Sequence, residues 1–279
     1  MFRIRSLSVV LAAASLVVFA MTGPATASVV LYNQNFENPS GFVNDSSDVN
    51  IVRSINQLYG GQPSGFTFAQ DFTVETLLIT GNKAFGTGYS DPQRIGGNYT
   101  LGMLSTANND LLGLSFNVQG KEFLNFRLNI SSIDLSAFGG PFNQSLSAVP
   151  VFVITLFDNP SGSTTLSGNG TVLDFAQITG IASTSRSQFN WTEHTIALNA
   201  SGSATGNVTV RIDLLNTLGS GYAAFDNFLI VASDTPGDVE TPAVPEPASI
   251  VLSGVGLAAL LVTRRRNRPR TASHVAGRV

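Results

Sequence analysis

The chain has 279 residues, contains no cysteine and carries a formal net charge of −3 at pH 7. Without cysteine it can form no disulfide and no Cys-ligated zinc site, and thiolate chemistry is excluded. The fold must therefore depend on a hydrophobic core, and the roughly 200 residues between the two ends are enough to build one.

The N-terminus has the order of a secretory signal peptide. Two arginines precede an apolar run, Leu7–Phe19, and the small-residue tripeptide Ala25–Ala27 follows it. This order predicts a signal helix within residues 1–27, with cleavage before Ser28. A transmembrane anchor is the weaker interpretation, because the apolar run is short and Pro24 follows it.

Charge is segregated along the chain. Eight of the 15 basic residues lie in the two ends, whereas all 18 acidic residues lie between Glu37 and Glu246. The predicted exported region, Ser28–Pro247, thus has 7 basic and 18 acidic residues, a net charge of −11. Such a region repels phosphates and excludes nucleic acid as a partner. The negative charge of this region would favour the binding of divalent cations, or would simply keep the region soluble.

Between the ends, short apolar runs alternate with turn residues, which predicts strands. The predicted strands are Val29–Tyr32, Phe66–Ala69, Phe72–Val74, Leu77–Ile79, Leu112–Val118, Phe123–Ile130, Val149–Phe157, Val172–Ile178, Trp191–Leu198, Val208–Leu215 and Ala223–Val231. Residues 81–110 are predicted to be a loop, with a strand signal only at Tyr99–Leu101. No stretch before residue 248 has helical periodicity.

This spacing predicts one all-β domain, an antiparallel β-sandwich of jelly-roll type over residues 28–232. The clearest strand is Phe123–Ile130, where alternation puts Leu124, Phe126, Leu128 and Ile130 on one face. Residues 233–243 are polar and contain proline, and we expect a linker there.

Few residues are suited to catalysis. His194 is the one histidine of the exported region, and the motifs G-x-S-x-G and H-E-x-x-H are absent from the sequence. Alternation predicts Trp191 and Glu193 on one face of their strand and His194, as a solvated side chain, on the other. We therefore expect no enzyme, although paired carboxylates of a glycan-cleaving site could meet in space.

The C-terminus has three parts in a fixed order. The tripeptide Pro245–Pro247 is extended, because its prolines fix φ and lack N–H donors. The apolar run from Ala248 to Val262 follows, predicting a weak transmembrane helix, shorter than the ~20 residues usual for a span. The cluster Arg264, Arg265 and Arg266 is predicted to stop transfer, leaving residues 271–279 as a cytoplasmic extension.

These three parts, over residues 244–270, resemble the PEP-CTERM sorting signal of exported bacterial proteins. The resemblance implies exosortase, a membrane-embedded cysteine transpeptidase, as a partner, with Pro245, Glu246 and Pro247 as the sorting motif. It also implies transient anchoring in the inner membrane, followed by release to the cell surface or extracellular matrix. A plain single-pass anchor is the alternative.

Two short motifs resemble parts of carbohydrate-binding jelly-roll modules: Asn35-Phe36-Glu37 near the first strand and Phe225-Asp226-Asn227 in the last. The resemblance implies that Glu37 and Asp226 meet and hold a structural calcium ion, which takes six to eight oxygens, partly from backbone carbonyls. Alternatively, both acids cap turns or face water.

Aromatic residues bear on ligand binding. Phenylalanine dominates with 19 residues, against one tryptophan and five tyrosines, although sugar platforms favour the latter two. The tyrosines near glycine, Tyr59, Tyr89, Tyr99 and Tyr222, are predicted to be exposed contacts. The resulting hypotheses are a non-enzymatic exported surface protein, a carbohydrate-binding adhesion module for extracellular polysaccharide, and a secreted glycan-cleaving enzyme.

Overall fold

The computed structural model describes residues 27–43, 49–50, 53–60, 67–70, 74–79, 90–105, 111–132, 149–168, 170–182, 188–215 and 221–240. The predicted signal peptide, transmembrane helix and sorting signal lie outside these residues. The chain divides into two compact units, residues 1–241 and 242–279, and all that follows concerns the first.

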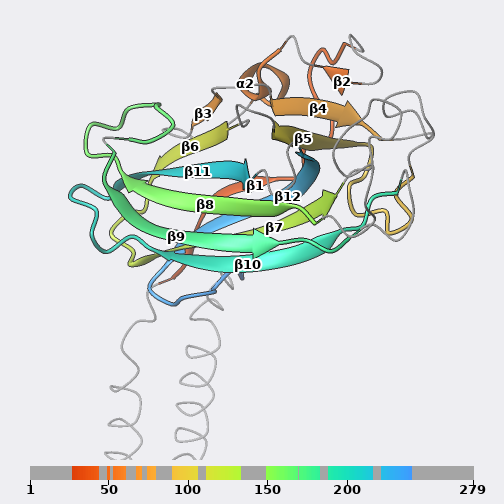
Figure 1. Ribbon diagram of the computed structural model, residues 1–279. Coiled ribbons are helices and arrows are strands. Elements are labelled where there is room, and N and C mark those ends of the chain that lie inside the picture. Colours follow the sequence, from red (N-terminus) through yellow and green to blue (C-terminus); the bar gives the residue numbers. More distant parts are fainter. Residues whose placement is uncertain are drawn as a thin grey trace, which may run out of the picture. The chain divides into compact units, whose positions relative to one another are not determined.

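The described residues form strands and one helical turn (Figure 1). The strands are β1 (Val29–Gln34), β2 (Val49–Asn50), β3 (Thr67–Gln70), β4 (Val74–Leu78), β5 (Tyr99–Ser105), β6 (Leu111–Asn117), β7 (Phe123–Ser132), β8 (Val151–Asp158), β9 (Val172–Thr179), β10 (Thr192–Asn199), β11 (Asn207–Leu215) and β12 (Gly221–Ser233), and the helical turn is α2 (Ile55–Leu58).

The named strands lie in two antiparallel sheets. Sheet A has the order β10-β7-β12-β5-β4-β2, with β1 also paired to β12. Sheet B has the order β3-β6-β11-β8-β9. The predicted all-β antiparallel sandwich is therefore confirmed.

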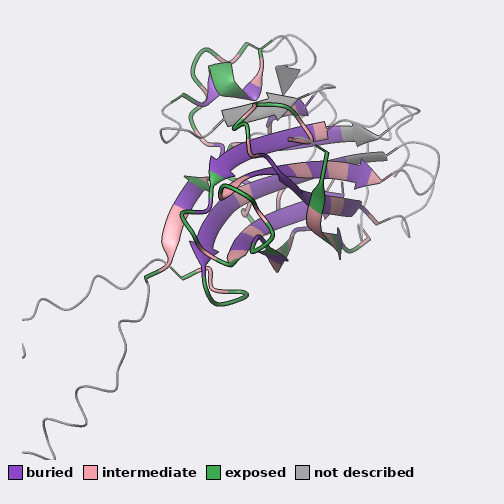
Figure 2. Cartoon of the chain, turned by 90° about the vertical axis from the view of Figure 1, so that its left-hand side faces the viewer, coloured by how far each residue is buried: buried purple, intermediate pink, exposed green. Residues whose placement is uncertain are grey.

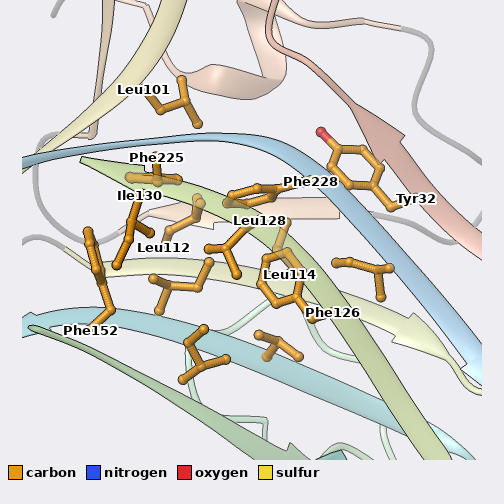
Figure 3. Close-up of a cluster of buried hydrophobic side chains, with 14 of the residues drawn as sticks. Tyr32, Leu101, Leu112, Leu114, Phe126, Leu128, Ile130, Phe152, Phe225 and Phe228 are labelled. Atoms are coloured by element: carbon orange, nitrogen blue, oxygen red, sulfur yellow. The ribbon is translucent and has the colours of Figure 1, made fainter. Parts of the chain in front are cut away.

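The core lies between the two sheets, and Leu124, Phe126, Leu128 and Ile130 of β7 are completely buried in it. Figure 3 shows the last three of these beside Leu112 and Leu114 of β6. The predicted inner face of this strand is thus confirmed. Figure 2 shows the wider pattern, in which many strands are buried over most of their length and exposed residues gather in the connections, whereas β9 and β10 are mostly half-buried or exposed.

The structure corrects three details of the predicted elements. The predicted loop 81–110 ends earlier, because β5 runs for seven residues and its small residues Gly102 and Ser105 pair with β12. The strand predicted at Leu77–Ile79 is part of β4, which begins earlier, at Val74; Phe72 and Thr73 of the strand predicted before it lie outside the described residues. Neither β2 nor α2 was predicted, because two and four residues are too short for a periodic pattern.

No helix among the described residues is long and apolar enough to span a membrane. The predicted signal helix and transmembrane helix fall in the ranges 1–26 and 241–279, which the structure does not describe.

Phe126 tests the single core. Its ring packs edge-to-face against that of Phe228, with 4.8 Å between ring centroids, and its side chain has no exposed surface. We expect Phe126→Ala to lower the free energy of unfolding by about 3–5 kcal/mol in one cooperative urea transition. Val172→Ser, at a half-exposed position, should change it by at most about 0.5 kcal/mol. Equal effects of the two variants would contradict a shared core around Phe126.

Candidate functional site

The first and last strands of the domain pair with each other. In the antiparallel ladder of β1 and β12, Gln34 lies opposite Phe228 and Val29 opposite Ala232. The segment that follows β1 therefore lies beside the middle of β12. The pairing of the first and last strands is thus observed, and the negative charge of Glu37 acts on Asp226, whereas the ion that the two were expected to share stays a prediction.

The local backbone explains where the Glu37 side chain lies. Phe36 has a positive φ of 52°, and its ring is buried edge-to-face between those of Tyr59 and Phe228. The side-chain oxygens of Gln34 and Asn35 accept the N–H groups of Phe36 and Glu37, at 3.0 and 3.3 Å. This turn buries Phe36 and leaves the next side chain, Glu37, to face a neighbouring loop.

The Glu37 carboxylate is held by the start of β5. Its Oε1 accepts the backbone N–H groups of Asn98 (2.6 Å) and Tyr99 (3.2 Å), and its Oε2 accepts the Asn98 side-chain amide at 3.0 Å. Gly97 has φ of +58°, and a Cβ there would overlap this carboxylate. The glycine therefore allows the close approach of backbone to carboxylate.

Asp226 lies inside the domain, with 1% of its surface exposed. Its Oδ1 accepts the backbone N–H of Asn227 at 2.6 Å, whereas its buried Oδ2 has no hydrogen-bond partner in the described part of the chain. Burial, the largest cause, together with the negative charges of Glu37 and Asp91 raises the pKa of Asp226 from 3.8 to about 8. At neutral pH this carboxyl needs either a proton or a cation.

The loop before β5, residues 91–98, contacts β12 beside Asp226. The Asp91 carboxylate accepts the N–H groups of Gln93, Arg94 and Gly96 at 3.1, 2.9 and 2.9 Å. Asn227, at positive φ, donates its side-chain amide to the carbonyl of Ile95 at 3.1 Å. The loop is thereby fastened to the bulge of β12.

We call Glu37, Asp226 and the loop 91–98 the acidic site. An orphaned buried carboxylate oxygen near a second carboxylate is a donor set that suits a hard cation such as calcium. The described residues contain no group of three or more acidic, histidine or cysteine side chains arranged for a metal ion. A cation here would therefore need backbone carbonyls or water as well.

His194 differs from the prediction of a solvated side chain. It is half-buried, burial lowers its pKa, and its Nε2 has no hydrogen-bond partner among the described residues. Trp191 precedes β10, which begins at Thr192; it is buried and stacks on Phe189 with 5.5 Å between ring centroids, whereas Glu193 is exposed.

The tyrosine prediction is wrong for Tyr59, which is 3% exposed and packs on Phe36. Burial raises its pKa. The burial of Tyr59 depends on residues distant in sequence, such as Phe36, so the adjacent glycines wrongly indicated an exposed loop. Tyr99 is half-buried, and the structure does not describe the side chains of Tyr89 and Tyr222.

Sheet B carries a polar and aromatic row on the face away from the core, which the sequence analysis missed. Arg211 of β11 lies opposite Thr155 of β8, which lies opposite Phe175 of β9. Phe175 is 67% exposed. The alternation Val210-Arg211-Ile212, with both neighbours buried, was the signal that could have placed Arg211 on this face.

Arg211 is held by an aromatic ring. Its Cζ lies 5.0 Å from the centroid of the Phe157 ring, within range of a cation–π interaction. Its Nε has no hydrogen-bond partner in the residues described, and Gly113 lies opposite it on the other side. We call Arg211, Thr155 and Phe175 the sheet B row.

The C-terminal residues match a known protein family model. Residues 243–266 match the family model "PEP-CTERM protein-sorting motif", which confirms the resemblance predicted from Pro245–Pro247 and the residues after it. The motif indicates an exported chain that is sorted by exosortase. No curated protein matches the chain.

Solved structures with similar folds include adhesin and carbohydrate-binding domains. The K3 cleaved adhesin domain of Lys-gingipain from Porphyromonas gingivalis is 12% identical, with 73% of this chain and 98% of that chain covered and a TM-score of 0.37. The CBM22-1 xylan-binding domain of Xyn10C from Paenibacillus barcinonensis is 13% identical, with 76% and 99% covered and a TM-score of 0.37. Another xylan-binding CBM22 domain, 14% identical, covers 76% and 99% with a TM-score of 0.38.

The raised pKa of Asp226 makes stability depend on pH in a predictable direction. Between pH 3.8 and about 8 the folded state holds a proton that the unfolded state has released, so raising the pH favours unfolding. We expect the melting temperature of the domain in chelator to fall between pH 5 and 8 through this group. Asp226→Asn, which does not titrate, should show a smaller fall, and identical slopes would contradict a buried, proton-binding Asp226.

Proposed function

We propose that this chain is a non-enzymatic, exported β-sandwich protein that exosortase processes and releases to the cell surface or extracellular matrix. The match of residues 243–266 to the sorting motif is the observation that supports this function. The segregation of acidic residues into the region before Pro247 is consistent with an exported, soluble part. The apolar run and arginines of the motif would provide the transient anchor.

Replacing Pro245, Glu246 and Pro247 together with alanine tests the sorting step. In a host with exosortase, the wild-type protein should lose the residues beyond about Pro247, whereas the triple variant should stay in the membrane fraction. Pro242→Ala, a proline change outside the tripeptide, is the matched control and should be processed normally. A released wild-type protein with an intact C-terminus by mass spectrometry would rule out this function.

We further propose that calcium binds at the acidic site. Glu37 and Asp226 would hold the ion together with backbone carbonyls, and the ion would supply the positive charge that the buried Asp226 carboxylate lacks. Because Glu37 follows the first strand and Asp226 lies in the last, the ion would link both ends of a domain that has no disulfide.

Thermal melting tests this site. An ion at a hundredfold excess over its Kd stabilises the folded state by about 2.7 kcal/mol. Millimolar calcium should therefore raise the melting temperature at pH 8, and magnesium should do so less, since it requires stricter octahedral geometry. Asp226→Asn should remove the calcium effect, and Glu193→Gln, an exposed acid on β10, should retain it. A wild-type melting temperature that chelator leaves unchanged would exclude the ion.

Carbohydrate binding is the second candidate function, and the sheet B row is the observation that favours it. Adjacent strands lie about 4.8 Å apart, so Arg211 and Phe175, separated by Thr155, lie about 10 Å apart across the sheet. The exposed ring of Phe175 offers an apolar face to a sugar, and the half-buried guanidinium of Arg211 offers hydrogen bonds to its hydroxyl groups, whereas Thr155 between them is buried. A glycan-cleaving enzyme, the third hypothesis, has no specific observation in its favour.

A glycan array with the purified domain, followed by affinity electrophoresis on the best ligand, tests the second function. Phe175→Ala and Arg211→Gln should each weaken retention by about tenfold, the loss of one stacked or charge-assisted contact. Thr195→Ala, at an exposed position on sheet A, should leave retention unchanged. Retention that survives both row variants would place any glycan site elsewhere.

A further inference from the structure

The residues after β12 are fastened to the domain, although sequence analysis predicted a polar linker from residue 233. The Asn125 side chain, fully buried on β7, bonds the turn at two points. Its Nδ2 donates to the carbonyl of Thr235 at 3.0 Å, and its Oδ1 accepts the N–H of Gly237 at 2.7 Å. One amide thus holds two backbone positions of the chain that leaves the sandwich.

Further contacts close the same turn. Lys121 forms an ion pair with Asp234 at 2.9 Å. The Ser233 hydroxyl lies 2.9 Å from an Asp238 carboxylate oxygen and accepts the N–H of Thr235 at 2.9 Å. We call this arrangement, the turn 233–238 with Lys121 and Asn125, the clasp.

The clasp sits on the outward face of sheet A. Val231 of β12 lies opposite Asn125, and the β7 neighbours Leu124 and Phe126 point into the core, so Asn125 points away from it. A buried amide on an outward face costs free energy unless it is hydrogen-bonded. Its bonds to Thr235 and Gly237 therefore favour the closed turn over a free one.

The clasp reduces the number of residues that separate the fastened part of the domain from the sorting motif. With the clasp closed, the six residues 239–244 separate Asp238 from Pro245, and they can span at most about 22 Å. With the clasp open, the eleven residues 234–244 can span at most about 40 Å. Opening the clasp therefore extends the reach of the motif almost twofold.

We propose that the clasp limits the reach of the Pro-Glu-Pro tripeptide and thereby the rate at which exosortase processes the chain. This inference rests on the proposed sorting function. With the clasp closed, the folded sandwich stays within a short chain length of the tripeptide and hinders the approach of a membrane-embedded enzyme. With the clasp open, the tripeptide reaches the enzyme while the domain remains folded.

Gly237→Ala opens the clasp with little other change. Gly237 has φ of +78°, which alanine adopts reluctantly, and a Cβ there would meet no atom within 4 Å. The open population should rise about tenfold, which hydrogen exchange at the Gly237 amide position measures directly. Gly170→Ala is the matched control, because Gly170 has φ of +86° and equally open surroundings in another turn.

A second variant leaves the clasp intact. Inserting Gly-Ser-Gly-Ser after Thr241 lengthens the segment between the clasp and Pro245 from six to ten residues without touching Asn125, Thr235 or Gly237. Pulse–chase labelling in a host with exosortase then compares the half-times of processing of the full chains.

Both Gly237→Ala and the insertion should shorten the half-time severalfold, whereas Gly170→Ala should match the wild type. An insertion that leaves the half-time unchanged would overturn the proposal, because reach would then not limit processing. So would a Gly237→Ala chain that exchanges faster yet is processed at the wild-type rate. Failure of the sorting function is distinguishable, since the alanine tripeptide variant would then be processed like the wild type, or no chain would be processed at all.

Discussion

The pairing of β12 along both edges is the interaction on which the rest of the domain depends. Its thirteen residues pair with β7 on one edge and with β5 and then β1 on the other, and the change of partner falls around Asn227 and Phe228. The register shift there turns the Phe228 ring onto Phe36, Phe126 and Phe225 in the core. One strand thus fixes the N-terminal segment, the middle of sheet A and the most crowded part of the core.

The same register shift accounts for the acidic site. Asp226 precedes it and is buried, and Asn227 within it bonds the loop before β5. Burial disfavours the ionised form of the Asp226 carboxyl, so its pKa rises to about 8. The fold keeps it at the point where the first strand, the last strand and the 91–98 loop meet. A proton and a cation are then competing ways to neutralise one group.

Local patterns in the sequence predict the strands and their inner faces, but not the features that depend on contacts between distant residues. Alternation alone placed Leu124, Phe126, Leu128 and Ile130 inside, because period two follows from strand geometry. The sorting tripeptide was likewise identified from its own residues. By contrast, the burial of Tyr59 depends on Phe36, and the role of Asn125 depends on residues 110 and 112 positions away. No local pattern carries such contacts.

The central position of β12 also has a mechanical consequence. Tension applied at the C-terminal end of the domain would first load the clasp and, once the clasp opened, would reach β12 through Ser233. The ladders to β7 and β1 flank the second half of β12, so their hydrogen bonds would be loaded together in shear rather than one at a time. A domain pulled by flow from this end would therefore resist unravelling better than one whose last strand lay at a sheet edge.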